Sequence, residues 1–251
     1  MRITLTVFLL FFALFFRVQA QTTRVNTTNT NSWWMYFGNH QISARWGLHA
    51  EAQFRLYDGV SDWQQLLLRT GINYYAKQVR YTLGYAFVKT HPYGDFPVLN
   101  AFPEHRMWEQ FLVSQELGNV SLHHRYRLEQ RWIGNTITGD FDDVRYENRF
   151  RYMLRATIPL QKNREKGKWY LGFYDELFIN AGKEVAYNIF DQNRAYAALG
   201  YKLGKIGKIE MGYLYQVVQQ RRLLEISNPP QLIFEHNHTF QLALFSDLSF
   251  R

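Results

Sequence analysis

Long runs of alternating apolar and polar residues are the feature that most restricts how this chain folds. The run from Trp46 to Tyr57 shows the alternation clearly. Its apolar face contains Trp46, Leu48, Ala50, Ala52, Phe54 and Leu56, and its polar face contains Gly47, His49, Glu51, Gln53, Arg55 and Tyr57. Successive side chains of a strand point to opposite faces, so a period of two predicts a strand. A helix made of the same residues would be polar all round.

Two later runs repeat the pattern and place charged residues on the polar face. Between Val120 and Trp132, that face holds His123, Arg125, Arg127, Glu129 and Arg131. Between Val144 and Ile158, it holds Arg145, Glu147, Arg149, Arg151 and Arg155. The three runs together indicate an all-β chain whose strands have one apolar and one charged face.

Eleven segments are predicted as strands, and the breaks between them alternate in length. The predicted strands are 32–41, 46–57, 63–76, 79–90, 104–117, 120–133, 144–159, 168–180, 191–203, 208–220 and 235–246. Short breaks fall at 76–78, 118–119 and 204–207, and longer ones at 91–103, 134–143, 181–191 and 221–234. Barrels of bacterial outer membranes have short periplasmic turns and longer outer loops. We therefore expect an antiparallel up-and-down transmembrane β-barrel.

The strand count conflicts with the even number that single-chain bacterial barrels usually have. A total of about twelve strands would remove the conflict if the Thr/Asn-rich stretch from Thr22 to Asn31 formed another strand. Two other interpretations stay open, because this stretch could run through the lumen or the count could be wrong. Threonine and asparagine are compatible with all three.

Residues 1–20 are predicted to be a cleaved secretory signal peptide. Arg2 supplies a positive charge, Ile3 to Phe16 is apolar, and Val18-Gln19-Ala20 resembles a small-residue cleavage site. The alternative is a membrane anchor, but the apolar run ends before Arg17 and is shorter than the roughly 18 residues that a spanning helix needs. The expected organisation is a signal peptide (1–20), a Thr/Asn-rich segment (21–31) and a barrel (32–251).

Composition narrows the class of protein further. The chain has no cysteine, which excludes a disulfide framework and a thiolate metal site. Aromatic residues make up 18% of the chain although its mean hydropathy is −0.36, which suits strands that face lipid on one side and water on the other. The net charge of +8 raises the possibility of nucleic-acid binding. We expect no nucleic-acid partner, because the basic residues alternate with apolar ones along strands of an exported chain.

Alternation alone does not say which face of the barrel is inside. Lipid outside is favoured by long strands, by aromatic residues near strand ends, and by the ending Leu248-Ser249-Phe250-Arg251. This ending resembles the aromatic-ended last strand recognised by barrel-insertion machinery, although the terminal Arg251 departs from that pattern. The predicted location is the outer membrane, in contact with its lipid and lipopolysaccharide. A soluble periplasmic lipid-carrier barrel, with an apolar interior, is the alternative.

In a membrane barrel the charged faces are predicted to line the lumen, because an arginine in hydrocarbon costs roughly 2–4 kcal/mol at the midplane. The candidates are Glu51, Arg55, Arg69, Arg80, Glu104, Arg106, Glu116, Arg125, Arg127, Glu129, Arg131, Glu147, Arg149, Arg151, Glu176, Arg194 and Glu210. Two interpretations are open: a salt-bridged plug that holds the barrel together, or a lining selective for anionic solutes. A barrel of this size allows a plugged lumen or a narrow passage.

A search for catalytic and metal-binding patterns identifies no recognised motif. A lipid-modifying enzyme would need a serine, such as Ser114, Ser121 or Ser246, to meet a histidine across strands. The histidines considered are His123, His124, His236 and His238; the first two point to opposite faces, and the last two alone make an incomplete metal site. Asp140, Asp142 and Asp143 are expected in a solvated outer loop. We therefore expect no catalytic residue, no metal and no cofactor.

Several segments together resemble one protein family. They are Trp63-Gln64-Gln65-Leu66 with Arg69, Leu83-Gly84-Tyr85, Pro103-Glu104-His105-Arg106, His124 to Arg131, Asn148 to Tyr152, and Asp191 to Arg194. The run HRYRLEQR is the most specific, because it sets alternating charges in a fixed order. The chain resembles the domain-of-unknown-function 2490 family of predicted outer-membrane proteins. That resemblance implies a single barrel in Bacteroidetes-type envelopes and no established activity. The expected role is non-enzymatic, either limited solute passage or structural or surface binding.

Overall fold

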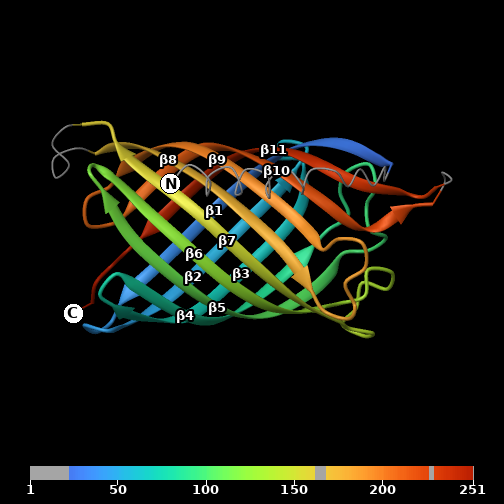
Figure 1. Ribbon diagram of the computed structural model, residues 1–251, viewed down its shortest axis with the longest axis horizontal. Helices are drawn as coiled ribbons and strands as arrows, with labels where there is room; N and C mark the ends of the chain where they lie inside the picture. Colours follow the sequence, from blue (N-terminus) through green and yellow to red (C-terminus); the bar gives the residue numbers. More distant parts are fainter. Residues whose placement is uncertain (1–22, 162–167, 226–228, 251) are drawn as a thin grey trace, which may run out of the picture.

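The alternating runs form eleven strands that close into one barrel, and no helix is present in the described residues (Figure 1). The computed structural model describes residues 23–161, 168–225 and 229–250. The strands are β1 (Arg24–Gln41), β2 (Trp46–Tyr57), β3 (Asp62–Ala76), β4 (Val79–Thr90), β5 (Phe102–Leu117), β6 (Val120–Ile133), β7 (Arg145–Pro159), β8 (Trp169–Ala181), β9 (Phe190–Lys202), β10 (Lys208–Leu224) and β11 (Gln231–Ser246). The predicted signal peptide lies outside the described residues. Within them, no helix is long and apolar enough to cross a bilayer.

The barrel closes through a parallel pair, which corrects the expectation of about twelve wholly antiparallel strands. Each strand pairs antiparallel with the next, and β1 pairs parallel with β11 from Arg24↔Leu232 to Gly38↔Ser246. In an up-and-down barrel with an odd number of strands, the first and last strands run in the same direction, so their contact must be parallel. Eleven described strands therefore close without a twelfth.

The Thr/Asn-rich stretch is the first half of β1 in its described part. Thr27, Asn29 and Asn31 are buried in the lumen, whereas Asn26 and Thr28 are exposed. Its backbone hydrogen-bonding groups pair with β11, which satisfies them as in any inner strand. The barrel begins at Arg24 and not at residue 32 as predicted.

The connections define two different ends of the barrel. Most short connections, 42–45, 77–78, 118–119 and 203–207, lie at one end, here called the turn end, and most longer ones, 91–101, 134–144 and 182–189, lie at the loop end. The exceptions are the short connection 58–61 at the loop end and the longer connection between β7 and β8 at the turn end. Gly118 in the predicted Gly-Asn turn has a φ of 58°, a conformation that glycine adopts readily. The last strand finishes at the turn end (Figure 1), where Phe250 N donates to Gln41 O at 2.9 Å.

The apolar faces of the strands point outward and most charged faces point inward. Leu68 and Phe150 are exposed on the outside, whereas Glu129 is fully buried inside. This arrangement is the reverse of a soluble lipid-carrier barrel. One side of the interior is less polar, because Trp33, Leu214 and Ala243 form the centre of a small hydrophobic core between β1, β10 and β11.

Aromatic side chains gather on the outer surface near both ends. At the turn end, Trp46 packs against Tyr74 with ring centroids 5.0 Å apart, and Trp169 packs against Tyr201 at 4.7 Å. At the loop end, Trp132 packs against Tyr146 at 5.4 Å. These pairs mark two aromatic bands, and the zone between the bands is mainly apolar.

The parallel closure predicts a specific cross-link. Thr30 and His238 are partners in the β1–β11 register and both face outward. Because paired strands bring Cα atoms within the range of a disulfide, the double variant Thr30→Cys/His238→Cys should oxidise to an intramolecular bridge in the otherwise cysteine-free chain. The disulfide is detected by the loss of free thiols and by a changed gel mobility. The matched pair Thr30→Cys/Leu244→Cys should stay reduced, and its efficient oxidation instead would contradict the register.

Candidate functional site: the charged lumen

The structure places most of the predicted lumen residues around one internal cavity of about 430 Å³. Period-two alternation is the cause, since every second residue of each strand points inward. Thirteen candidates line the cavity: Glu51, Arg55, Arg69, Arg80, Glu104, Arg106, Arg125, Arg127, Arg131, Arg149, Arg151, Glu176 and Arg194. Glu129, Glu147 and Glu210 are buried behind this lining, where each forms an ion pair with an arginine. Glu116 differs, because it is exposed at the turn end, where Ser121 donates to it.

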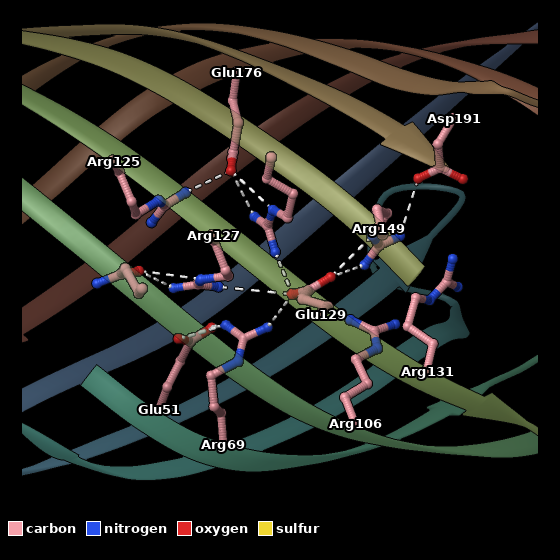
Figure 2. Close-up of polar contacts among 12 residues, drawn as sticks. Glu51, Arg69, Arg106, Arg125, Arg127, Glu129, Arg131, Arg149, Glu176 and Asp191 are labelled. Carbon is pink, nitrogen blue, oxygen red and sulfur yellow. Dashed lines mark hydrogen bonds and ion pairs between the residues drawn. The ribbon is translucent and has the colours of Figure 1, made fainter. Parts of the chain in front are cut away.

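Glu129 of β6 is the centre of the ion-pair network (Figure 2). Its Oε2 accepts from Arg149 Nε at 2.9 Å, and its Oε1 accepts from Arg151 Nη1 at 2.7 Å and from Arg69 Nη2 at 3.3 Å. Arg127 Nη1 lies 3.9 Å from Oε1. One fully buried carboxylate is thus surrounded by four guanidinium groups from three strands.

The network continues from Glu129 to both sides of the lumen. Toward β2, Arg69 Nη1 donates to Glu51 at 2.7 Å. Toward β8, Arg151 Nε donates to Glu176 at 2.9 Å, and Arg125 Nη2 donates to the same Oε1 at 2.7 Å. The chain of charges therefore crosses the lumen from β2 to β8, as Figure 2 shows.

A second group of ion pairs lies toward the loop end. Glu104 accepts from Arg106 Nε and Arg131 Nε, each at 2.6 Å. Arg131 also lies 3.6 Å from Glu147, to which Arg145 Nε donates at 2.7 Å. These contacts tie β5, β6 and β7 together inside the barrel.

Several functional residues were missed by sequence reasoning. Asp191, which pairs with Arg149 at 2.9 Å, sits where the β8–β9 register shifts between Phe178 and Ile179. A bulge breaks simple alternation, so the pattern did not reveal that this carboxylate faces inward.

Not all aromatic residues face outward. Trp33 and Trp108 are buried in the lumen. Arg55 Cζ lies 4.0 Å and Arg194 Cζ 5.0 Å from the Trp33 ring centroid, and Arg127 Cζ lies 4.7 Å from that of Trp108. Aromatic rings packed against guanidinium groups stabilise these cations in a space with little water. Trp108 is separated from Glu104 and Arg106 by an even number of residues, so all three lie on the same face of the strand. This spacing was the sequence signal that could have shown that the Trp108 side chain points inward.

The β4–β5 connection, residues 91–101, covers the loop end of the cavity. It reaches strands on the opposite side of the barrel: Gln220 Nε2 donates to Phe96 O at 3.1 Å and Arg222 Nη2 to Pro97 O at 3.2 Å. Tyr93 points into the cavity, and its hydroxyl donates to Glu235 Oε2 at 2.9 Å. Burial raises the pKa of Tyr93 well above its usual value, and the Glu235 carboxylate raises it further. The hydroxyl therefore stays protonated as a donor at neutral pH.

The histidines and serines considered for catalysis do not come together as a bonded pair in the described residues. Ser114 and His123 are cross-strand partners, but no hydrogen bond joins them. His124 bonds Tyr152 at 2.9 Å, and His236 and His238 bond Tyr215 and Tyr213. The described ranges contain no group of three or more His, Cys, Asp or Glu side chains able to hold a metal ion. Asp142 accepts from Thr138 in the β6–β7 loop.

Fold and lumen together define a closed β-barrel with an apolar outer surface and a lumen packed with ion pairs. Comparison with protein families finds a match over residues 30–223 to the family described as protein of unknown function (DUF2490). The chain belongs to this family, and the match spans β1 to β10. Neither the curated proteins nor the solved structures compared with it contain a match.

The network predicts that Glu129 is a major determinant of stability. The variant Glu129→Gln keeps the shape of the side chain but leaves the surrounding guanidinium groups without their central anion. Breaking a buried ion pair on one side costs about 3–5 kcal/mol, and we expect a loss of this size in the free energy of unfolding measured by urea titration. Asp143→Asn, the same chemical change in an exposed loop, is the control and should stay within about 0.5 kcal/mol. Equal stability of the two variants would contradict the central role of Glu129.

Proposed function

We propose that this chain is a non-enzymatic outer-membrane barrel whose own side chains keep its lumen nearly closed. The observation that carries the proposal is the combination of an apolar outer surface with a largely buried charge network inside. A water-exposed surface has no need for so many large apolar residues. A wide pore, in turn, would leave lumen charges hydrated, whereas Glu129, Glu147 and Glu176 are almost completely buried.

The outer surface supports contact with lipid. Aromatic bands at the turn and loop ends correspond to the girdles of outer-membrane barrels at the two interfaces. Between them, two outward carboxylates are satisfied across strands: Gln130 Nε2 donates to Glu109 at 3.1 Å, and Asn193 Nδ2 donates to Asp175 at 3.0 Å. Such hydrogen bonds lower the cost of a polar group in an apolar surrounding.

The predicted signal peptide, the C-terminal residues and most of the connections support export and one orientation in the membrane. The predicted signal peptide directs the chain out of the cytoplasm, and the turn end, with the C-terminal residues next to β1, faces the periplasm. Insertion machinery binds the last strand, and the longer loops meet lipopolysaccharide outside. This orientation places residues 91–101 over the external opening.

The lumen supports a role other than general diffusion. Its cavity has the size of a small-molecule site, since such sites measure about 300–1,000 Å³. Positively and negatively charged side chains occur on the same strands and form ion pairs with each other. This pairing favours the salt-bridged plug over an open selective lining. The barrel then serves a structural or binding role, with at most narrow passage.

The lipid-facing surface is tested by an arginine placed midway between the two aromatic bands. Leu68 lies at the centre of β3 and points outward. In a bilayer, Leu68→Arg should lose about 2–4 kcal/mol of unfolding free energy in phospholipid vesicles. The control Leu99→Arg changes an exposed leucine of the 91–101 loop and should have little effect. A neutral Leu68→Arg would argue for a water-exposed surface.

Cell fractionation tests the location directly. The native protein should remain in the outer-membrane fraction after a carbonate wash and should migrate differently on gels before and after boiling. Release into the soluble periplasmic fraction would refute the membrane location.

Planar bilayers test the closed lumen. The reconstituted protein should give no porin-like steady conductance, whereas Glu129→Gln, with the network broken, should show more frequent openings. A large steady conductance of the wild-type protein would contradict the plug.

A further inference from the structure

The lumen carries more positive than negative charge, and the excess is not spread evenly. Twelve cationic side chains line the cavity, against five carboxylates in the lining and four more buried behind it, Glu129, Glu147, Glu210 and Glu235. Most lining arginines have a carboxylate close by, as Arg69 and Arg151 do around Glu129. Among the described lining cations, Arg55, Arg80, Arg194 and Lys208 are the ones without a carboxylate oxygen within 4.0 Å, and Lys208 lies at the turn end, at the start of β10. Arg80 lies apart, near the turn end at the start of β4.

Arg55 and Arg194 come from different parts of the barrel to the same indole ring. Arg55 of β2 is the register partner of Trp33 on β1, and Arg194 of β9 reaches the ring from beyond β10 and β11. Their Cζ atoms lie 4.0 and 5.0 Å from the Trp33 ring centroid. Both arginines are only 8% exposed. Two buried like charges close to each other are unfavourable unless an anion lies between or beside them.

The partners of these two arginines are neutral. Arg55 Nε donates to Gln53 Oε1 at 3.0 Å and Arg55 Nη1 to Gln65 Oε1 at 2.6 Å. Arg194 Nε donates to Gln192 Oε1 at 3.0 Å, and its terminal nitrogens donate to no described residue. Glutamine oxygens orient the guanidinium groups without neutralising them, so each keeps its full charge and Arg194 keeps free donors toward the cavity.

The nearby carboxylates are already occupied. Glu51 accepts from Arg69, and Glu176 accepts from Arg125 and Arg151. Glu235 accepts from Tyr93. Glu51 and Glu176 are thus held by other arginines, and Glu235 is held by the neutral donors Tyr93 and Gln220.

We propose that Arg55 and Arg194, beside Trp33, form a binding site in the lumen for a small solute that bears a carboxylate or phosphate group. The planar guanidinium group has paired donors that match the oxygens of either anion. The cavity of about 430 Å³ accommodates a small organic anion next to them. The inference requires the barrel and its lumen, and it does not depend on the membrane location proposed above.

The test is calorimetric titration of the purified full-length protein in detergent, with its fold checked by gel mobility before and after boiling. The probes are inorganic phosphate, gluconate as a carboxylate, and glucose as a neutral control. Saturable binding of phosphate or gluconate, and none of glucose, is expected for the wild-type protein. The anion that binds more tightly identifies the chemistry of the solute. Failure of both anions to bind to folded protein overturns the proposal.

The variants assign the binding to these arginines. Arg55→Gln and Arg194→Gln should each weaken anion binding by about tenfold or more, which corresponds to the loss of one charge-assisted contact. Arg45→Gln, which removes an arginine exposed in a short turn, is the matched control and should bind as the wild-type protein does. Unchanged binding in both lumen variants overturns the assignment.

Thermal unfolding provides a second readout that a failure to fold does not mimic. Because Arg55 and Arg194 repel each other, the variants should unfold in anion-free buffer at a temperature no lower than the wild-type protein. Phosphate or gluconate should raise the unfolding temperature of the wild-type protein and of Arg45→Gln, but not of the lumen variants. An equal rise in all four proteins contradicts the site. If the protein binds anions in detergent but is absent from the outer membrane, only the membrane location fails.

Discussion

The desolvation of charge inside the barrel is the constraint on which the rest of the structure depends. Taking a carboxylate or guanidinium group out of water costs several kcal/mol even after relaxation, and only close partners offset that cost. Glu129 meets this requirement by accepting hydrogen bonds from three arginines. Each of those arginines, in turn, holds another carboxylate or ring. These contacts join the inward faces of β2, β3, β6, β7, β8 and β9 in one network.

The same network explains why the lumen is nearly filled. Arginine side chains are long, and their flat groups stack on Trp33, Trp108 and Phe178 while reaching carboxylates across the barrel. Stacking and pairing together occupy the centre of a barrel that glutamate and alanine alone would leave open. The neutral side of the lumen, where Leu214 and Ala243 pack near Trp33, completes the filling without further charge.

Closure by a parallel pair links the topology to the shape of the lumen. Because β1 and β11 run in the same direction, the chain starts its first strand at the loop end and finishes its last at the turn end. Asn29 and Asn31 of β1 then lie beside the inward amides of β11, and Asn29 Nδ2 donates to Asn237 Oδ1 at 2.8 Å. Apart from Glu235, neutral hydrogen-bonding side chains line this seam, whereas the opposing wall contains most of the ion pairs. The cavity thus has a charged side and a neutral side, with Arg55 and Arg194 at the boundary.

The sequence by itself determined the class of fold, most strand positions and the inward direction of residues such as Glu51, Arg127 and Glu129. This was possible because the period of two is a local property of a strand and survives in the order of residues. The tertiary structure decided what depends on register and closure: the parallel β1–β11 pair, the inward Asp191 at a bulge, the inward Trp33, and which arginines found carboxylates. Partner choice in a closed barrel depends on which strands meet across the lumen, and residues as distant as Trp33 and Arg194 come together only there. Charge placement was therefore readable from the sequence, whereas charge pairing was not.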